Sequence, residues 1–151
     1  MDSDLCREVE NAIGVFFHDK TLLVDAVTSK SYAKEAMEKD PSIAMLDNER
    51  LEFLGDSVLE LVIRDYLFTH SSESEAILSS LADELVNDEY LYQVAVKMGL
   101  KKYVRLGVGE ANNVEKNQLV GALEAIIGAI YLDAGLSRAI NFILEQIILS
   151  K

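Results

Sequence analysis

The sequence predicts an all-α protein that forms one domain. The 151-residue chain contains a single proline, Pro41, and because proline interrupts helices, its scarcity leaves long segments free to be helical. Apolar residues recur along most of the chain at intervals of three and four, the spacing of one helix face. Half of the residues are hydrophobic, so a chain of this length can bury a real core. We therefore expect a single helical domain over residues 1–151.

The first half of the chain is expected to contain one long helix preceded by shorter ones. A first helix is predicted from Ser3 to about Phe17, and a short second helix over residues 21–27, with Thr21 as its N-cap. Residues 34–47 are polar, so we expect a helix end followed by a loop there. The long helix is then predicted over residues 47–69.

The second half is expected to hold four helices and one long loop. Residues 74–98 have a helical pattern that breaks near Asn87, which indicates two helices. Residues 99–113 carry three glycines and two asparagines, so they are predicted to be a loop. Residues 118–133 are apolar on almost every side, which is typical of a helix in the middle of a fold. A final amphipathic helix is predicted after Gly135.

Acidic residues gather on one face of the predicted long helix. Glu49, Glu52 and Asp56 follow one another at intervals of three and four, so their carboxylates stack over consecutive turns. Like charges at this spacing repel one another, and the strongly apolar residues between them indicate a helix that is largely buried. A cation is therefore needed nearby, and carboxylate oxygens suit a divalent ion such as Mg²⁺.

A fourth carboxylate, Glu124, stands alone in the centre of the apolar segment 118–133. An isolated buried carboxylate either takes up a proton or costs several kcal/mol. Two interpretations follow. Glu124 is either a protonated, hydrogen-bonded core residue or a ligand that completes a site with Glu52 and Asp56, and the second is the better supported.

Asn48–Leu59, with the sequence Asn-Glu-Arg-Leu-Glu-Phe-Leu-Gly-Asp-Ser-Val-Leu, resembles the signature motif of the ribonuclease III family. Residues 22–32 resemble a second family element, with Ser29 where the family commonly has histidine. Residues 123–133 resemble the last conserved element without gaps. The resemblance implies a helical-bundle endonuclease domain that acts as a homodimer.

The resemblance also assigns roles to the acidic residues. It implies that Glu52, Asp56 and Glu124 bind Mg²⁺, with Mn²⁺ as a possible substitute, and that Glu49 is an accessory catalytic carboxylate. The implied reaction is hydrolysis of double-stranded RNA that leaves 5′-phosphate and 3′-hydroxyl ends. One turn before Glu124 the family usually has a further acidic ligand, and here that residue is Gly121. The resemblance also implies that the aromatic residue beside the acidic face, Phe53, packs across the dimer interface.

Net charge alone argues against a nucleic-acid partner, because the chain carries −12 at neutral pH. Residues 97–116 differ, with five basic and two acidic residues. This segment is either an ordinary solvated basic face or the region that contacts phosphates. The candidates for RNA contact are Lys101, Lys102, Arg105 and Lys116. Against strong RNA affinity, the predicted helix that begins near residue 74 carries serines and acids where the family tends to have basic residues.

The cysteine content and the N-terminal sequence indicate where the protein is located in the cell. The single cysteine, Cys6, is typical of a reducing compartment, and no signal peptide or membrane-spanning stretch is apparent, so we expect a cytoplasmic protein. We expect no double-stranded RNA-binding domain of the kind that many family members carry, because the predicted helices extend to Lys151. Two hypotheses remain: a compact endoribonuclease, or a noncatalytic RNA-binding or scaffold protein that keeps the dimeric fold.

Overall fold

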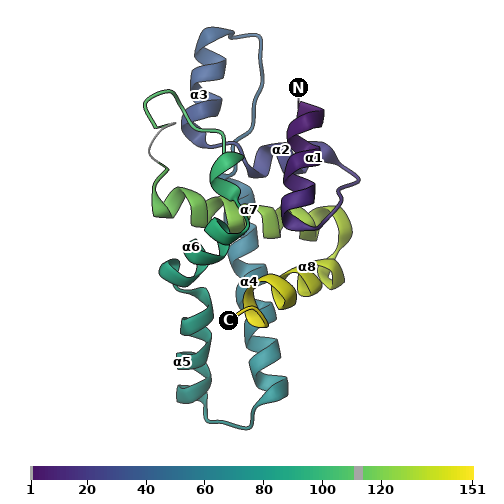
Figure 1. Cartoon of the computed structure of the whole chain (residues 1–151), viewed down its shortest axis with the longest axis vertical. Coiled ribbons are helices and arrows are strands. Elements are labelled where there is room, and N and C mark those ends of the chain that lie inside the picture. The colour runs from purple at the N-terminus through teal and green to yellow at the C-terminus, as the bar shows by residue number, and fades with distance from the viewer. Residues whose placement is uncertain (1, 111–113) are drawn as a thin grey trace.

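The computed structural model describes residues 2–110 and 114–151, and within them the regular elements are all helical, which confirms the predicted fold class. Figure 1 shows their arrangement. The α-helices are α1 (Asp2–Ile13), α2 (Lys20–Ala26), α3 (Lys30–Lys39), α4 (Glu49–His70), α5 (Glu75–Val86), α6 (Asp88–Lys97), α7 (Lys116–Ala134) and α8 (Leu136–Ile143). Two short turns complete the set: a 3₁₀ turn, Leu100–Lys102, and a π turn, Leu144–Ile148.

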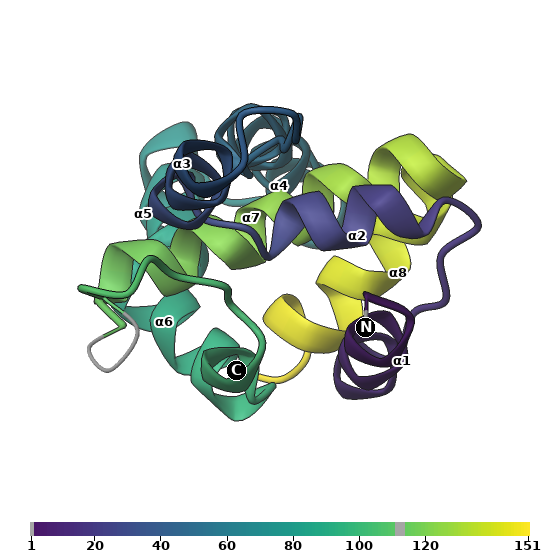
Figure 2. The same ribbon diagram turned by 90° about the horizontal axis from the view of Figure 1, so that it is seen from above.

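Helix α7 is the centre of the molecule, as its apolar composition predicts. It crosses α4 in the middle of the structure, and α2, α6 and α8 also pack against it (Figures 1 and 2). The buried residues of α7 are Leu119, Val120, Gly121, Ala122, Leu123, Ala125, Ile126, Ile127, Gly128, Ala129 and Ile130. Only a helix surrounded on nearly all sides can bury so many residues. Helix α7 is therefore the core helix against which α2, α4, α6 and α8 pack.

Two glycines allow α4 and α7 to approach closely where they cross. A Cβ atom at Gly55 of α4 would lie 1.7 Å from the carbonyl oxygen of Glu124. A Cβ atom at Gly128 of α7 would lie 2.4 Å from the carbonyl oxygen of Leu51. Any larger residue would therefore force the two helices apart. The crossing brings the acidic face of α4 next to the middle of α7.

The N-terminal elements differ from the predicted ones in three places. Helix α1 ends at Ile13, because Gly14 adopts a φ of +74° that terminates the helix before the predicted end. The side chain of Asp19, not that of Thr21, caps α2 by accepting a hydrogen bond from the Thr21 N–H. Where a helix end and a loop were expected, a complete helix, α3, begins after the N-cap Ser29.

The predicted loop over 99–113 contains the 3₁₀ turn Leu100–Lys102 and then runs along α2 and α3; its residues 111–113 lie outside the described residues. The Ser29 N–H donates to the carbonyl of Arg105, and the Arg105 N–H donates to the carbonyl of Val27, at 3.0 and 2.7 Å. The Ser31 hydroxyl accepts from the Gly107 N–H. These bonds fix the loop beside the start of α4. Within the described part of the chain, no helix is long and apolar enough to cross a membrane.

Candidate active site

The structure brings together all four carboxylates that the sequence singled out. Glu49, Glu52 and Asp56 project from α4, and Glu124 comes from α7 at the helix crossing. They line a common pocket of about 470 Å³. The full lining is Glu49, Glu52, Phe53, Asp56, Val86, Asp88 and Glu124. Four residues that the sequence singled out from local spacing and from the isolation of Glu124 thus share one pocket.

Asp88 adds a fifth carboxylate that sequence reasoning did not assign to this site. It lies in the first turn of α6, and it reaches the pocket because the turn between α5 and α6 packs beside α4 and α7. No local pattern connects this residue with the α4 carboxylates. Its position depends on tertiary packing alone.

The pocket holds negative charge in a partly desolvated place. Burial, a hydrogen bond with Asp56 and the nearby charges of Asp56, Glu52 and Asp88 raise the pKa of Glu124 to about 8. The pKa of Glu52 is also raised, first by burial and then by the charges of Glu49 and Asp56. At neutral pH Glu124 therefore holds a proton, which it must give up to bind a cation. The protonated state agrees with the first interpretation of Glu124, and its role as a metal ligand stays a prediction.

The raised pKa predicts how stability depends on pH. A glutamate in an unfolded chain has a pKa of about 4.3, so between that pH and about 8 the folded protein keeps a proton that the unfolded chain releases. The free energy of unfolding should therefore fall as pH rises through this window. With a chelator present, Glu124→Gln should be more stable than the parent at pH 9, by on the order of 2 kcal/mol, and similar to it at pH 4.

Urea unfolding followed by circular dichroism at pH 4, 6, 7.5 and 9 measures this difference. Asp65→Asn is the control, because Asp65 is an exposed carboxylate on α4, outside the acidic pocket, and its loss should keep the parental pH dependence. Equal pH dependence in the parent and Glu124→Gln would contradict the assignment of the proton to Glu124.

Gly121 lies against Glu52. A Cβ atom at position 121 would lie 2.8 Å from Glu52 Oε2, so the Glu52 carboxylate sits where a side chain at 121 would begin. A second, polar pocket of about 320 Å³ opens on this side. Its lining is Ser29, Lys30, Ser31, Asn48, Glu49, Glu52, Val104, Glu110, Asn117, Gln118 and Gly121. Glu52 thus stands between two pockets and lines both.

The donor set suits a hard divalent cation, although the side chains are not gathered around a single point. Among the described residues, no three His, Cys, Asp or Glu side chains are grouped closely enough to hold a metal ion. Asp56 and Glu124 contact each other, whereas Glu52 leans over Gly121. Carboxylates that are desolvated and repel one another are the chemistry that Mg²⁺ compensates. The donor types fit such an ion, and Glu52, Asp56 and Glu124 are the residues that would hold it.

A cation from α3 lies beside the acidic face. Lys30 Nζ lies 3.6 Å from Glu49 Oε1. Both side chains are more than half exposed, so this ion pair contributes little to stability, but it fixes a positive charge at the rim of the site. Sequence reasoning found no partner for Glu49 on its own helix, since the partner lies on an element that it did not predict as a complete helix.

The four basic residues proposed for RNA contact differ in the contacts that their side chains make within the protein. The ammonium groups of Lys101 and Lys116 lie 5.5 and 5.6 Å from the ring centre of Tyr92, and Lys116 also pairs with Glu89. The guanidinium of Arg105 lies 4.6 Å from the ring centre of Tyr32 and donates to the Thr28 hydroxyl. Lys102 is exposed. None of the four lines either pocket beside α4.

Phe53 is the most exposed large apolar residue beside the acidic face. Its side chain is 81% exposed although it adjoins Glu52 in sequence. A mostly apolar pocket of about 890 Å³ lies next to it, with lining residues from α2, the 45–47 segment, α4 and α7. The apolar lining includes Leu22, Met45, Leu46, Leu51, Leu54 and Leu132.

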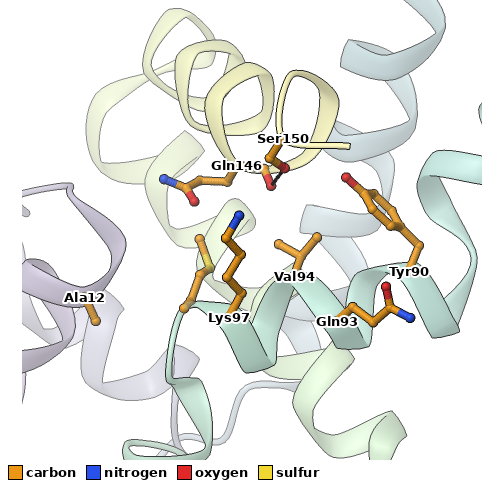
Figure 3. A pocket seen from close by; sticks show the side chains of 8 residues that line it. Ala12, Tyr90, Gln93, Val94, Lys97, Gln146 and Ser150 are labelled. Atoms are coloured by element: carbon orange, nitrogen blue, oxygen red, sulfur yellow. Dashed lines mark hydrogen bonds between the residues drawn. The ribbon is translucent and has the colours of Figure 1, made fainter.

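A further pocket of about 270 Å³ lies between α6 and the C-terminal turn (Figure 3). In this view Lys97 projects from α6 toward Gln146. None of the described residues that line it is acidic, and it shares no residue with the acidic pocket. We do not assign it to the active site.

The fold is helical, and carboxylates from α4 and α7 line one pocket where these two helices cross. A family model described as Ribonuclease-III-like matches residues 19–151. The chain belongs to the ribonuclease III family, as the resemblance of residues 48–59 indicated.

Individual relatives agree with this assignment. Ribonuclease 3 of Carboxydothermus hydrogenoformans is 44% identical over 147 residues, which are 95% of this chain and 61% of that protein. Ribonuclease 3 of Borreliella burgdorferi is 41% identical over 145 residues, 93% of this chain and 57% of that protein. The chain therefore spans about three fifths of the length of these relatives.

Solved structures of the same fold are also similar. A nuclease domain of ribonuclease III from Campylobacter jejuni has a TM-score of 0.81 and 38% identity, with 92% of this chain and 93% of that chain covered. A second structure of that domain has a TM-score of 0.80 and 37% identity, with 95% and 94% covered. The fold described above is therefore that of a ribonuclease III nuclease domain.

Proposed function

We propose that this chain is a divalent-metal-dependent endoribonuclease that hydrolyses phosphodiester bonds of double-stranded RNA and leaves 5′-phosphate and 3′-hydroxyl ends. The observation that carries the proposal is the convergence of Glu52, Asp56 and Glu124 from two helices at one pocket. Membership of the ribonuclease III family supports it. The catalytic set is these three carboxylates, with Glu49 as an accessory.

The protein's own residues prepare the site for Mg²⁺, or for Mn²⁺ as a substitute. Such an ion neutralises charge on the scissile phosphate and activates water for attack. Glu52, Asp56 and Glu124 would hold it, and Glu124 releases its proton as it does so, so metal affinity should increase with pH up to about 8. Glu49, paired with Lys30, stays at the rim, where it faces an approaching backbone.

The RNA duplex would be recognised by its shape and its phosphates, because the deep, narrow major groove of A-form RNA keeps side chains from reading the base edges. Lys101, Lys102 and Lys116 are the proposed phosphate contacts, and Arg105 should contribute least, since its guanidinium already binds Thr28 and Tyr32. With a net charge of −12, the domain should bind duplex RNA weakly, and the salt dependence of its affinity should correspond to about three phosphate contacts, one for each of these lysines.

We further propose that the active form is a homodimer in which two sites cut opposite strands. One of the C. jejuni structures is described as flexible in a region involved in dimer formation. In this chain, an 81% exposed phenylalanine beside a mostly apolar pocket is a self-complementary surface. Phe53 of each protomer would occupy the pocket of its partner.

Replacing Phe53 with alanine should weaken the dimer strongly. A two-fold interface loses the side chain twice, at roughly 2 kcal/mol each, so the dissociation constant should rise by about a thousandfold. Sedimentation equilibrium measures this constant. Phe68→Ala is the matched control, since Phe68 lies further along α4 and is 77% exposed. A dimer unaffected by Phe53→Ala would exclude this interface.

The proposed activity is tested with a long, perfectly paired RNA duplex, purified protein and Mg²⁺. We expect fragments whose 5′ ends accept label from a kinase only after phosphatase treatment. Single-stranded RNA and a DNA duplex of the same sequence should remain intact. The proposal is wrong if the RNA duplex remains intact both with Mg²⁺ and with Mn²⁺.

The second candidate function is a noncatalytic RNA-binding or scaffold dimer, which Gly121 favours because the family usually has an acidic ligand there. The two candidates differ in their response to metal. An enzyme should gain thermal stability from Mg²⁺, and the gain should disappear in Glu124→Gln and Asp56→Asn. We also infer a cytoplasmic location, which suits an RNA substrate and the buried free thiol of Cys6.

A further inference from the structure

The space beside Gly121 is filled by a carboxylate from another helix. The three atoms nearest to a Cβ at position 121 are Oε2, Cδ and Oε1 of Glu52, at 2.8, 3.1 and 3.3 Å. Side-chain carbon atoms do not normally approach other heavy atoms as closely as the first of these distances. The present position of the Glu52 carboxylate therefore requires glycine at 121.

In this position Glu52 still lines the acidic pocket, but among the described residues it is not grouped with Asp56 and Glu124 closely enough for the three to hold a metal ion. Beside Gly121 the carboxylate borders the pocket that contains Ser29, Ser31 and Asn117. The opposite direction leads to Asp56 and Glu124, which already contact each other. A third carboxylate pressed against that pair would add repulsion in a partly desolvated site. The space at Gly121 relieves this repulsion.

We propose that Gly121 is a positioning residue that holds Glu52 away from the metal site until a divalent cation binds. The inference rests on the proposed function, because it concerns binding of the same ion. In this proposal the Glu52 side chain has two conformations, one over Gly121 and one beside Asp56 and Glu124. Only the second conformation can bind Mg²⁺, so the population of the first lowers the apparent affinity for Mg²⁺.

Substitutions at 121 should then act through Glu52. In Gly121→Ala the new methyl group excludes the carboxylate, and the flexible end of Glu52 is displaced toward Asp56 and Glu124. Alanine supplies no ligand. Any gain in metal affinity in this variant must therefore come from Glu52, whereas Gly121→Asp would mix displacement with a new carboxylate.

The test is a double-mutant cycle with Gly121→Ala, Glu52→Ala and the combined variant. Calorimetric titration with Mg²⁺ should give a dissociation constant about fivefold lower in Gly121→Ala than in the parent. In the Glu52→Ala background the same substitution should change it less than about twofold. Gly109→Ala is the control for a plain glycine substitution, since a Cβ there meets nothing within 4 Å.

Thermal melting with a chelator tests the same coupling without metal. Alanine at 121 should raise the melting temperature in the Glu52→Ala background, because alanine favours a helix over glycine. In the parent background the gain should be about 3 °C smaller, because the displaced carboxylate meets Asp56 and Glu124. Equal gains in both backgrounds, or a Mg²⁺ affinity unchanged by Gly121→Ala, would overturn the inference.

The two parts of the test separate this inference from the proposed function. If the parent does not bind Mg²⁺, both proposals are wrong: the site does not bind a divalent cation, and Gly121 does not control how Glu52 binds one. Failure of the inference alone would leave Mg²⁺ binding by the parent intact and dependent on Glu124, with no coupling between positions 121 and 52.

Discussion

Glu124→Gln is expected to reduce cleavage of duplex RNA by roughly a thousandfold, because an amide cannot replace the anionic oxygen that helps to hold the ion. Glutamine has almost the same shape as glutamate, so the packing of α7 should be retained. Single-turnover cleavage of a labelled duplex at saturating Mg²⁺ measures the loss. Asp56→Asn should behave in the same way, since Asp56 contacts Glu124 within the pocket.

Two controls separate this loss from unfolding. Asp65→Asn removes an exposed carboxylate elsewhere on α4 and should cleave at the parental rate. Glu124→Gln itself should be at least as stable as the parent at pH 8, because it removes a desolvated charge. Parental cleavage by Glu124→Gln would remove Glu124 from the catalytic set.

Gly55→Ala is expected to cause the largest loss of stability, on the order of 3 kcal/mol or more. The added Cβ would lie 1.7 Å from the carbonyl oxygen of Glu124, and a backbone atom in the middle of the buried α7 cannot move aside cheaply. The helices must separate, and Glu124 then moves away from Asp56. The variant should therefore lose activity together with stability. Urea unfolding gives the size of the loss.

Gly128→Ala should be destabilising for the same reason, since its Cβ would lie 2.4 Å from the carbonyl oxygen of Leu51. Gly109→Ala provides the comparison, because a Cβ there meets nothing within 4 Å and the change should alter stability by less than about 1 kcal/mol. If Gly55→Ala unfolds at the parental urea concentration, the close helix crossing does not hold the site together.

Much of the acidic site could be predicted from the sequence because its signals are local. Helical spacing puts Glu49, Glu52 and Asp56 on one face whatever the tertiary structure is. Glu124 stood out because it was the only charge inside an apolar helix. The contributions of Asp88 and Lys30 could not be predicted, since each depends on how a neighbouring helix packs against α4.

The close approach of α4 and α7 also lay beyond the sequence. In the sequence, Gly55 and Gly128 look like ordinary helix glycines. Only the structure shows that each one lies against the backbone of the other helix. The same is true of Gly121. The sequence indicated that an expected carboxylate was missing there, but only the packed helices reveal that Glu52 fills the space.

The sequence predicted which segments are helical better than it predicted where each helix begins and ends. The spacing of apolar residues extended the first helix through Gly14, whose left-handed backbone ends it. Helix α3 was seen only as a helix end before a loop, because its residues are mostly polar and its burial is slight. The central position of α7 was predicted correctly, since a helix that is apolar on all sides can bury that surface only when other helices surround it.

If the proposed function is right, three carboxylates suffice for catalysis without an acidic residue at position 121. Single-turnover cleavage of a long RNA duplex by the parent and by Gly121→Asp, side by side at equal Mg²⁺, decides whether they do. We predict that the parent cuts and that its cleavage is lost in Glu124→Gln and Asp56→Asn. An inactive parent beside an active Gly121→Asp variant would contradict the claim. If both are inactive while the protein still dimerises and binds duplex RNA, the scaffold function replaces the enzyme.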